Sequence, residues 1–348
     1  MPRQRHQKAI KRRRLWIATA SLFFMLCLRV ARVQPISSKR TNNLTASVRT
    51  GNPEAYMHLE NFAVMMTKAR GFVSLMYIDA GYLEMAKSFI CNLSFLNPKY
   101  LDQLAIITHG PAVATELRRF RAQLNIFDFN DIAPGQERSR RKLFFGQYEY
   151  FIVTLRRLRI QSALIQQGAN VFVIEADAMW FSPSVYDTIR KLLETSDFIT
   201  ANDRGLEQHG DKLVSAGFLA TNSTASSRKF FSMYIDTYER KLLHVTNKSG
   251  TIDLPGEQVY MTHLLQKASH LKVEWLDPCM FVCGKWYMSS SYRESCPNPL
   301  VLQNNWITGV DKKIQRAKRF HHWFLSLTGE CLIQVGDGSS RRDIDRES

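Results

Sequence analysis

The segment Val171–Pro183, VFVIEADAMWFSP, contains the pattern that decides the fold of this chain. Four apolar residues run without interruption into Glu175-Ala176-Asp177, and Gly168 stands just before them, where a helix commonly ends. A short unbroken apolar run is typical of a strand that is buried on both faces, as in a parallel sheet. The segment therefore predicts a helix followed by a buried strand whose carboxyl end carries two acids.

The two acids at the end of this strand, Glu175 and Asp177, are candidates for a cation site. They stand at positions i and i+2, so in an extended chain both side chains point to the same side. Open α/β sheets bind ligands outside the carboxyl ends of their strands, and two carboxylates held together there are costly without a cation. A divalent metal that holds a phosphorylated substrate would supply this cation. A helix-capping or surface pair is the alternative interpretation.

Most of the net charge of the chain lies at its amino terminus. The formal net charge is +16, and residues 1–40 contain 11 of the 47 Lys and Arg residues and no acid, which leaves +5 for the remaining 308 residues. So small an excess does not favour nucleic acid as a partner, and we expect none. The length of 348 residues is enough for one large domain or two small ones, each with a real core.

An apolar segment near the amino terminus predicts a membrane anchor. Leu15–Leu28 has 14 residues without charge, which is short for a span of ~20 residues. The longer segment 15–33 has 19 residues, with Arg29 and Arg32 near its end, where basic side chains can reach the interface. Seven Lys or Arg residues precede Leu15, so we predict a cytoplasmic tail over 1–14 and a signal anchor over 15–33. A cleaved signal peptide is the alternative, disfavoured by the long basic region before it.

Glycosylation sequons and cysteines both suit an oxidising lumen beyond this anchor. Asn-x-Ser/Thr occurs at four places: Asn43, Asn92, Asn222 and Asn247. Five cysteines lie outside the anchor, and Cys279, Cys283 and Cys296 fall within 18 residues. This spacing indicates a disulfide-stapled loop; a zinc site is the alternative, although it lacks a clear fourth ligand. The odd number leaves one thiol free or paired between chains.

Polar segments flank a region in which strands and helices alternate. Residues 34–55 are predicted to form a lumenal stem, residues 56–332 the folded domain, and residues 333–348 a disordered tail. The expected strands are 72–78, 104–108, 126–129, 171–174, 197–201, 214–221 and 273–276. The expected helices are 82–93, 112–123, 147–167, 186–194, 226–243, 256–265 and 311–319. Such alternation predicts one α/β domain with a mostly parallel sheet.

Several residues near the ends of these elements are candidates for ligand binding. Asp79 follows the first strand and either caps the next helix or lines a nucleotide pocket. Arg157 lies in the helix before the acid-bearing strand, where an arginine is either solvated or meets a diphosphate. Gly217 lies inside the strand 214–221, which often means close approach of a ligand or of another segment. The basic loop 135–142 is either a solvated surface loop or a contact for an acidic acceptor.

Five segments of the domain follow the order of a known family. They are the first strand with its Gly81-Tyr82 turn, ANVFVIEADAMWFSPS (169–184), SAGFLATNST (215–224), GEQVYMTHLL (256–265) and NNWITGVDKKIQRAK (304–318). Together they resemble the nucleotide-diphospho-sugar transferase domain family, which includes the plant rhamnogalacturonan xylosyltransferases and cell-wall arabinosyltransferases. The resemblance covers residues 70–325.

The resemblance implies a GT-A fold, which is Rossmann-like, and transfer of a sugar from a nucleotide sugar, with UDP expected as the nucleotide. The acceptor would be a glycan or glycoprotein, with retention of anomeric configuration. In this family an Asp-x-Asp motif holds Mn²⁺ or Mg²⁺ against the donor diphosphate. By position Asp177 is the metal-bound aspartate, and Glu175 replaces the first aspartate with a side chain one methylene longer. A histidine near the carboxyl terminus is a common third ligand; His321 or His322 could serve, and we select His322.

The resemblance assigns further residues to the site. Glu257 and Gln258 match a family Asp-Gln pair. Glu257 is a candidate nucleophile for a retaining reaction, with front-face attack by the acceptor hydroxyl as the other route; it could also be only an acid at a helix start. Arg157, Gly217 and Asn304 fall at donor-site positions, although Asn304 could be a turn residue. With the anchor, the resemblance implies a single-pass type II protein of the Golgi membrane with a lumenal catalytic domain.

Departures from the family pattern leave a non-catalytic function open. Ser215 replaces the usual Asn or Asp, and Gln303 stands where a His often precedes Asn-Asn-Trp. With Glu175, these substitutions favour the alternative of a non-catalytic lumenal sugar-binding or scaffold protein on the same fold. A glycoside hydrolase would need two acids that flank a sugar groove, and the sequence specifies no such pair. Core packing is the plain interpretation of Trp180 and Trp306.

Overall fold

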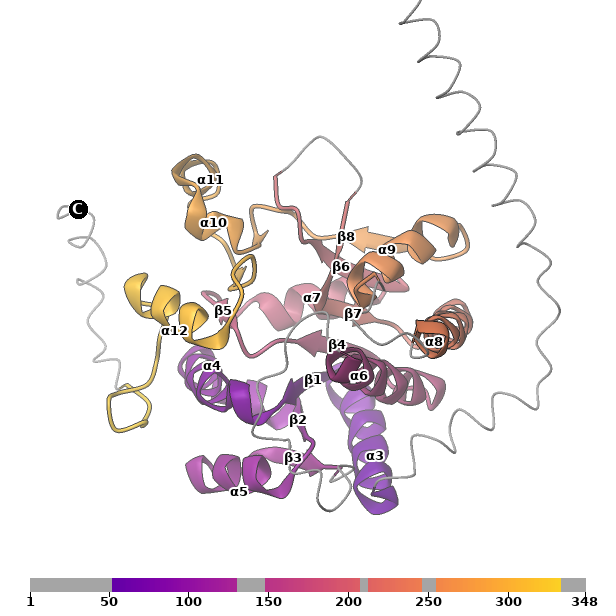
Figure 1. The fold of residues 1–348 in the computed structure, drawn as a ribbon, viewed down its shortest axis with the longest axis horizontal. Helices are drawn as coiled ribbons and strands as arrows, with labels where there is room; N and C mark the ends of the chain where they lie inside the picture. The colour runs from indigo at the N-terminus through magenta and orange to yellow at the C-terminus, as the bar shows by residue number, and fades with distance from the viewer. Residues whose placement is uncertain (1–51, 130–147, 207–211, 246–254, 333–348) are drawn as a thin grey trace, which may run out of the picture. The chain divides into compact units, whose positions relative to one another are not determined.

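The structure is a computed structural model, and it describes residues 52–129, 148–206, 212–245 and 255–332 (Figure 1). The predicted cytoplasmic tail, signal anchor, basic loop 135–142 and carboxyl-terminal tail lie outside the described residues, as does all but the end of the predicted stem. Within the described ranges, no helix is both long enough and apolar enough to cross a membrane. The first described helix begins at Pro53, close to the predicted start of the folded domain.

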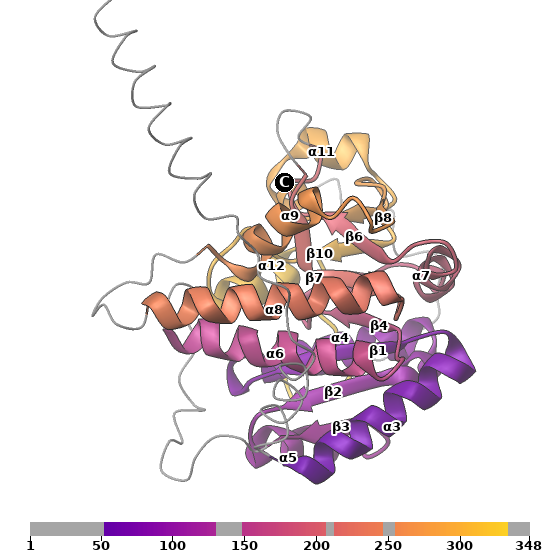
Figure 2. The same cartoon turned by 90° about the vertical axis from the view of Figure 1, so that its right-hand side faces the viewer.

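Seven strands form the central sheet of the described domain, in the order β3-β2-β1-β4-β7-β6-β8 (Figures 1 and 2). They are β1 (Val73–Ile78), β2 (Leu104–Thr108), β3 (Asn125–Asp128), β4 (Val171–Ile174), β6 (Phe198–Asn202), β7 (Val214–Thr221) and β8 (Val273–Trp275). All neighbouring strands are parallel except for β7, which is antiparallel to both β4 and β6. The predicted α/β fold with a mostly parallel sheet is therefore confirmed.

The strand order reverses between β1 and β4. The chain first runs outward from β1 through β2 to β3, and then returns to place β4 on the other side of β1. The two strands are parallel and in register up to the pair Met76 and Ile174. In open α/β sheets such a switch point opens a crevice at the carboxyl ends of the strands, where ligands bind. The acids that follow β4 lie at this point of the sheet.

Helices cover both faces of the sheet, because successive side chains of each strand point to opposite faces. One face carries α3 (Pro53–Arg70), α6 (Tyr148–Gln166), α8 (Ala225–Val245) and α9 (Glu257–Lys267). The other carries α4 (Leu83–Leu96), α5 (Pro111–Phe120) and α7 (Val185–Leu193). Within β4, Val171 and Val173 pack into the first layer, whereas Phe172 and Ile174 pack into the second. This explains why the central strand reads as a continuous apolar run.

A second, three-stranded sheet lies beside the carboxyl edge of the main sheet and was not predicted. Its order is β5-β10-β9, with β5 (Ala178–Trp180), β10 (Val301–Gln303) and β9 (Phe281–Val282). The short helices α10 (Lys285–Met288) and α11 (Ser290–Ser295) follow β9, and α12 (Val310–Arg319) follows β10. Trp180 at the end of β5 is fully buried, which confirms its predicted place in the core.

Two disulfides join distant parts of this region. Cys279 and Cys296 form the predicted staple, and Cys283 inside that loop is the free thiol, which is buried. The second disulfide, between Cys91 of α4 and Cys331, ties the segment after α12 to the main domain. The predicted disulfide-stapled loop is thus confirmed within the described residues, with one cysteine left unpaired.

One of the predicted sequons is unsuited to glycosylation. Asn92 lies in α4 and is only 3% exposed. Its side-chain amide donates to the carbonyl of Trp180 at 2.9 Å, and its side-chain oxygen accepts from the Trp180 N–H at 2.8 Å. This side chain therefore holds β5 against α4 and is not available for a glycan. Asn222 is half-buried and donates to the Leu193 carbonyl, and the other two sequons lie outside the described residues.

Candidate functional site

The chain turns sharply between the two acids that follow β4. The N–H of Ala178 donates to the carbonyl of Glu175 at 3.1 Å, as the chain leaves the main sheet for β5. The expectation that Glu175 and Asp177 point to the same side of an extended strand is therefore wrong. The Asp177 side chain is 1% exposed, whereas that of Glu175 is 38% exposed. The turn separates the environments of the two carboxylates.

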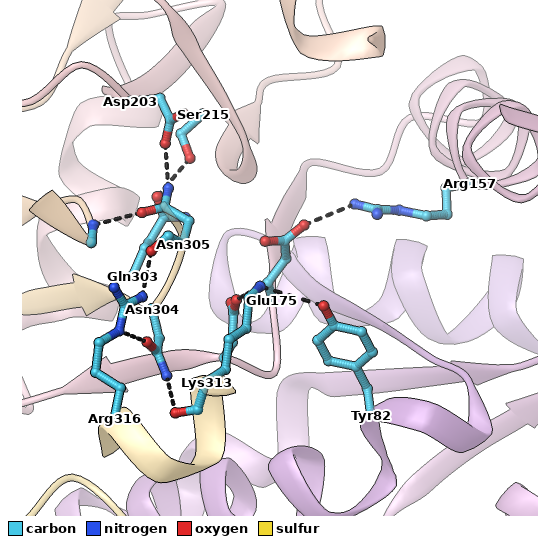
Figure 3. Close-up of polar contacts among 12 residues, drawn as sticks. Tyr82, Arg157, Glu175, Asp203, Ser215, Gln303, Asn304, Asn305, Lys313 and Arg316 are labelled. Atoms are coloured by element: carbon cyan, nitrogen blue, oxygen red, sulfur yellow. Dashed lines mark hydrogen bonds and ion pairs between the residues drawn. The ribbon is translucent and has the colours of Figure 1, made fainter. Parts of the chain in front are cut away.

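Asp177 is buried beside the ammonium group of Lys313 from α12 (Figure 3). The Lys313 Nζ lies 2.5 Å from Asp177 Oδ2 and 3.4 Å from the hydroxyl of Tyr82. Burial by itself would lower the pKa of Lys313, but the charges of Asp177, Tyr82 and Glu175 together with the hydrogen bond to Asp177 outweigh burial and raise that pKa, so the amine stays protonated. Asp177 Oδ1 has no hydrogen-bond partner among the described residues. One buried carboxylate oxygen is thus left to accept a further charged or polar group.

Glu175 lies over the backbone of β7, at a position that only glycine permits. An ideal Cβ at Gly217 would lie 2.2 Å from the Glu175 Cδ, so the missing side chain makes room for the carboxylate. Glu175 Oε1 lies 3.7 Å from Arg157 Nη2 of α6. Burial, together with the charge of Asp177, raises the pKa of Glu175 to about 7, and Arg157 opposes this shift. The extra methylene of Glu175 is therefore accommodated by Gly217.

Glu257 lies in the interior, on the inner side of Arg157. It is 7% exposed at the start of α9, and the Tyr150 hydroxyl donates to its Oε1 at 3.4 Å. Burial raises its pKa, and the charge of Arg157 counteracts this shift. Glu257, Arg157 and Tyr77 line a small cavity of about 10 Å³ between α6, α9 and the sheet. This position suits an acid that balances the Arg157 charge.

Gln258 belongs to a second polar cluster, which is centred on Asp203 after β6. Gln258 Nε2 donates to Asp203 Oδ2 at 2.8 Å, and Gln258 Oε1 accepts from the N–H of Ala216 at 3.3 Å. Asn305 Nδ2 donates to the other Asp203 oxygen (Figure 3). Asp203 was not predicted as a site residue, although it follows a buried strand in the same way as the acids after β4 do. The cluster ties β6, β7 and α9 to the segment after β10.

Asn304 orients α12 toward Asp177. Its N–H donates to the Asp177 carbonyl at 3.1 Å, and its side-chain amide donates to the Lys313 carbonyl at 2.9 Å. Its side-chain oxygen accepts from Arg316 Nε at 2.6 Å. With 2% of its surface exposed, Asn304 holds the lysine-bearing helix in place. The preceding residue, Gln303, accepts at 2.7 Å from the Ser215 hydroxyl, so two departures from the family pattern bond to each other.

Asp79 caps the short helix η1 (Ala80–Tyr82) that follows β1. Its Oδ1 accepts from the N–H groups of Gly81 at 2.8 Å and Tyr82 at 3.1 Å. This contact is the capping role that was one of the two predicted alternatives. By fixing the turn, Asp79 places the Tyr82 hydroxyl beside Lys313.

The predicted metal ligands Glu175, Asp177 and His322 do not form a three-residue cluster. In the described part of the chain, no three His, Cys, Asp or Glu side chains meet in a group that could hold a metal. His322 and Asp177 line the same small cavity of about 20 Å³. However, His322 Nδ1 lies 2.8 Å from the Tyr287 hydroxyl and the ring packs edge-on against Phe181. This environment is that of a partly buried aromatic cluster.

The profile of the nucleotide-diphospho-sugar transferase family matches residues 115–317. The chain belongs to this family. The sequence is 21% identical over 281 residues to the Arabidopsis thaliana UDP-D-xylose:L-fucose alpha-1,3-D-xylosyltransferase MGP4, covering 76% of this chain and 73% of the relative. The resemblance inferred from the five segments is therefore confirmed, and the chain carries a glycosyltransferase domain.

Two solved structures of sugar transferases are also similar to this chain. One is the galactosyltransferase LgtC in complex with donor and acceptor sugar analogs, at 12% identity and a TM-score of 0.44, covering 71% of this chain and 96% of that chain. The other is mouse xyloside xylosyltransferase 1, at 12% identity and a TM-score of 0.42, covering 67% of this chain and 97% of that chain.

Proposed function

We propose that this member of the family transfers a sugar from a nucleotide sugar to a hydroxyl of a glycan or glycoprotein. The observation that carries the proposal is the buried pair of Asp177 and Lys313 at the carboxyl edge of β4, with one Asp177 oxygen left without a partner. A preorganised charge pair at the switch point of an α/β sheet suits a diphosphate. The name of the Arabidopsis relative supports UDP as the nucleotide.

The donor diphosphate would lie on the β1 side of the site. Tyr82 and Arg157 are on that side, with Lys313 next to them (Figure 3). A nucleoside diphosphate leaving group gains negative charge as the glycosidic bond breaks, and fixed cationic side chains stabilise that charge. Lys313 is held in place by Asp177 and by Asn304, so little reorganisation is needed when the charge develops.

The residues present fit one Mn²⁺ or Mg²⁺ ion, with Asp177 as the main protein ligand. Such ions are often bound through one or two carboxylates together with substrate phosphates. Asp177 supplies a buried oxygen that has no other partner among the described residues. Glu175 is drawn toward Arg157 and His322 toward Tyr287, so both are secondary candidates. When bound, the ion would neutralise charge on the diphosphate.

Glu175 is better placed than Glu257 to meet the sugar. Its side chain is 38% exposed, whereas Glu257 is 7% exposed and borders a small cavity of about 10 Å³. A carboxylate with a pKa of about 7 can hold or release a proton near neutral pH, which suits a group that receives the proton of an acceptor hydroxyl. Retention of configuration is proposed from the family, with Glu175 as the carboxylate nearest to the reaction.

The disulfides support a location in an oxidising compartment. Cys91–Cys331 and Cys279–Cys296 both lie in the described domain, and such bonds are rare in the cytosol. They agree with the proposed Golgi lumen and with the proposed type II anchor.

Nucleotide binding by the full-length protein in detergent tests this proposal. We expect UDP with MnCl2 to raise the unfolding temperature. Asp177→Asn should abolish the part of this rise that depends on Mn²⁺. Glu116→Gln is the matched control, because Glu116 is an acid of α5 that pairs only with Arg119 in the described contacts. If neither UDP nor any other nucleoside diphosphate shifts the transition, the proposed function is wrong. Binding without sugar release would favour a non-catalytic sugar-binding protein.

A further inference from the structure

Trp306 is an exposed aromatic residue in an unfavourable backbone conformation. It directly follows Asn304 and Asn305, and 44% of its surface is exposed. Its φ angle is +58°, in the left-handed region that bulky side chains rarely adopt. Core packing, the interpretation given by the sequence, is therefore wrong for Trp306. Backbone strain of this kind persists where the surrounding structure enforces it, and it is concentrated at functional sites.

Two contacts fix the orientation of the indole ring. Trp306 Nε1 donates to the backbone carbonyl of Asp203 at 2.8 Å. The Lys285 ammonium lies 4.0 Å from the ring centroid, over one face of the indole. A ring that is held by a hydrogen bond and a cation is a rigid surface rather than a mobile side chain. The apolar surface of the ring stays exposed to solvent, and the backbone that carries the ring is strained. Packing explains neither feature.

Trp306 lies on the side of the site opposite to the position proposed for the donor. It is tied to Asp203 at the end of β6, whereas the switch point lies between β1 and β4. Figure 3 shows Asp203 and Asn305 on one side of Glu175, with Arg157 and Tyr82 on the other. A nucleotide placed at the switch point would be bound on the side of Arg157 and Tyr82. The cluster around Asp203 and Trp306 is then left for the second substrate.

We propose that the indole face of Trp306 opposite to Lys285 is the platform on which a sugar ring of the acceptor stacks. This inference rests on the proposed function and names its acceptor as a carbohydrate. A saturated sugar ring presents C–H groups on its faces and hydroxyls at its edges, which matches a flat apolar ring with polar neighbours. Lys285 covers the other face of the ring, and the adjacent Asn305 is bonded to Asp203. Asp203 is a positioning residue, since both its carboxylate oxygens already accept hydrogen bonds.

Direct sugar binding tests the platform without requiring turnover. The full-length protein in detergent is titrated with methyl glycosides of common pentoses, hexoses and 6-deoxyhexoses while tryptophan fluorescence is recorded. We expect a saturable change in the fluorescence of the wild type, and Trp306→Ala should remove it. Trp306→Phe should still bind the glycoside, as measured by calorimetry. Met57→Ala, which removes another exposed apolar side chain, is the control on α3 and keeps the wild-type response. A response equal in Trp306→Ala and wild type would overturn the proposal, as would no saturable response to any glycoside.

Kinetics then separate the failure of this inference from the failure of the proposed function. With the nucleotide sugar that supports turnover, Trp306→Ala should raise the acceptor KM by about tenfold, the effect of losing about 1.4 kcal/mol of stacking, and should change the donor KM by less than about twofold. A rise in the donor KM instead would contradict the acceptor assignment and leave the transferase function intact. Trp306→Gly relieves the left-handed strain. It should therefore unfold no more easily than wild type while showing the same loss of acceptor binding; a less stable Gly variant would indicate a structural role.

Discussion

Asp177 and Lys313 form an ion pair that is almost entirely removed from solvent. Their side chains are 1% and 12% exposed, and the two charged atoms lie 2.5 Å apart. Buried ion pairs contribute little net stability, because desolvation offsets the attraction. The pair is therefore better explained by electrostatic preorganisation of the site, which has a functional value.

Replacing Asp177 tests whether this pair serves the reaction or the fold. Asp177→Asn leaves the Lys313 ammonium buried without its counter-charge, so we expect the free energy of unfolding to fall by about 3 kcal/mol. Sugar transfer should fall by at least about 10²-fold. The double variant Asp177→Asn/Lys313→Met removes both charges and should regain most of the stability, as measured by urea unfolding. Wild-type transfer in that double variant would show that the pair is structural.

Gly217 and Glu175 should behave as one unit. Gly217→Ala places a Cβ 2.2 Å from the Glu175 Cδ, so the flexible carboxylate must leave its place beside Arg157. We expect about a tenfold loss of transfer with less than about 1 kcal/mol of destabilisation, since only a side-chain end moves. Adding Glu175→Asp, which shortens the side chain, should restore part of the activity. Gly110→Ala is the matched control because a Cβ there meets nothing within 4 Å; equal effects at both glycines would contradict the coupling.

The raised pKa of Glu175 predicts how stability depends on pH in the protein without nucleotide, measured in EDTA. Its folded-state pKa is about 7, against an ordinary value of 4.5. The folded state therefore binds more protons between these values, and stability should fall as the pH rises from about 5 to 8. The 38% exposure of the side chain limits the size of this effect. Glu175→Gln should flatten the difference between urea midpoints at pH 5.5 and 8; an unchanged pH dependence would contradict the assignment.

At the scale of elements, α12 connects the fold to the chemistry. It carries Lys313, and Asn304 holds its first turns. The chain after it is tied to α4 by the Cys91–Cys331 disulfide and by a hydrogen bond from Phe324 N–H to the Ser88 hydroxyl at 3.0 Å. Closing a longer loop restricts the unfolded chain more. The disulfide spans 240 residues of sequence, so it should stabilise both the domain and the position of α12.

Removing this disulfide should therefore cost more than removing the short one. In the chain-entropy model, Cys91→Ala/Cys331→Ala should lower the free energy of unfolding by about 2 kcal/mol more than Cys279→Ala/Cys296→Ala, whose separation is 17 residues. The first pair should also weaken UDP binding, because α12 is released at its end. Urea unfolding and calorimetry of both double variants measure the two effects. A larger loss in the Cys279/Cys296 variant would contradict the role given to the long-range bond.

At the scale of the whole molecule, local sequence patterns predicted the elements but not the way they meet. The predicted strands 171–174 and 214–221 agree with β4 and β7. For β4 the reason is its unbroken apolar run, which specifies a strand buried on both faces. Gly168 ends the preceding helix with φ at +94°, as its position indicated. The turn from Glu175 to Ala178, which takes the chain into a second sheet, leaves no periodic signal and was missed.

The site is harder to predict than the fold because its contacts are long-range. Lys313 and Asp177 are 136 residues apart, and Asn305 and Asp203 are 102 residues apart. Neither local propensity nor spacing encodes such pairs. Family resemblance pointed to Asp177 and to the segment after β10, which lie side by side in the structure. It could not reveal that Glu175 turns away over Gly217 or that His322 bonds to Tyr287.

The most direct test of the central claim is release of nucleoside diphosphate from a panel of nucleotide sugars, measured on the full-length protein with and without Mn²⁺. We predict that at least one UDP-sugar is cleaved in an Mn²⁺-dependent reaction, faster when a glycan acceptor is added, and that Asp177→Asn/Lys313→Met loses this activity. The assignment of Asp177 and Lys313 to the donor site is wrong if the folded wild-type protein cleaves no nucleotide sugar. It is also wrong if the double variant cleaves a nucleotide sugar at the wild-type rate.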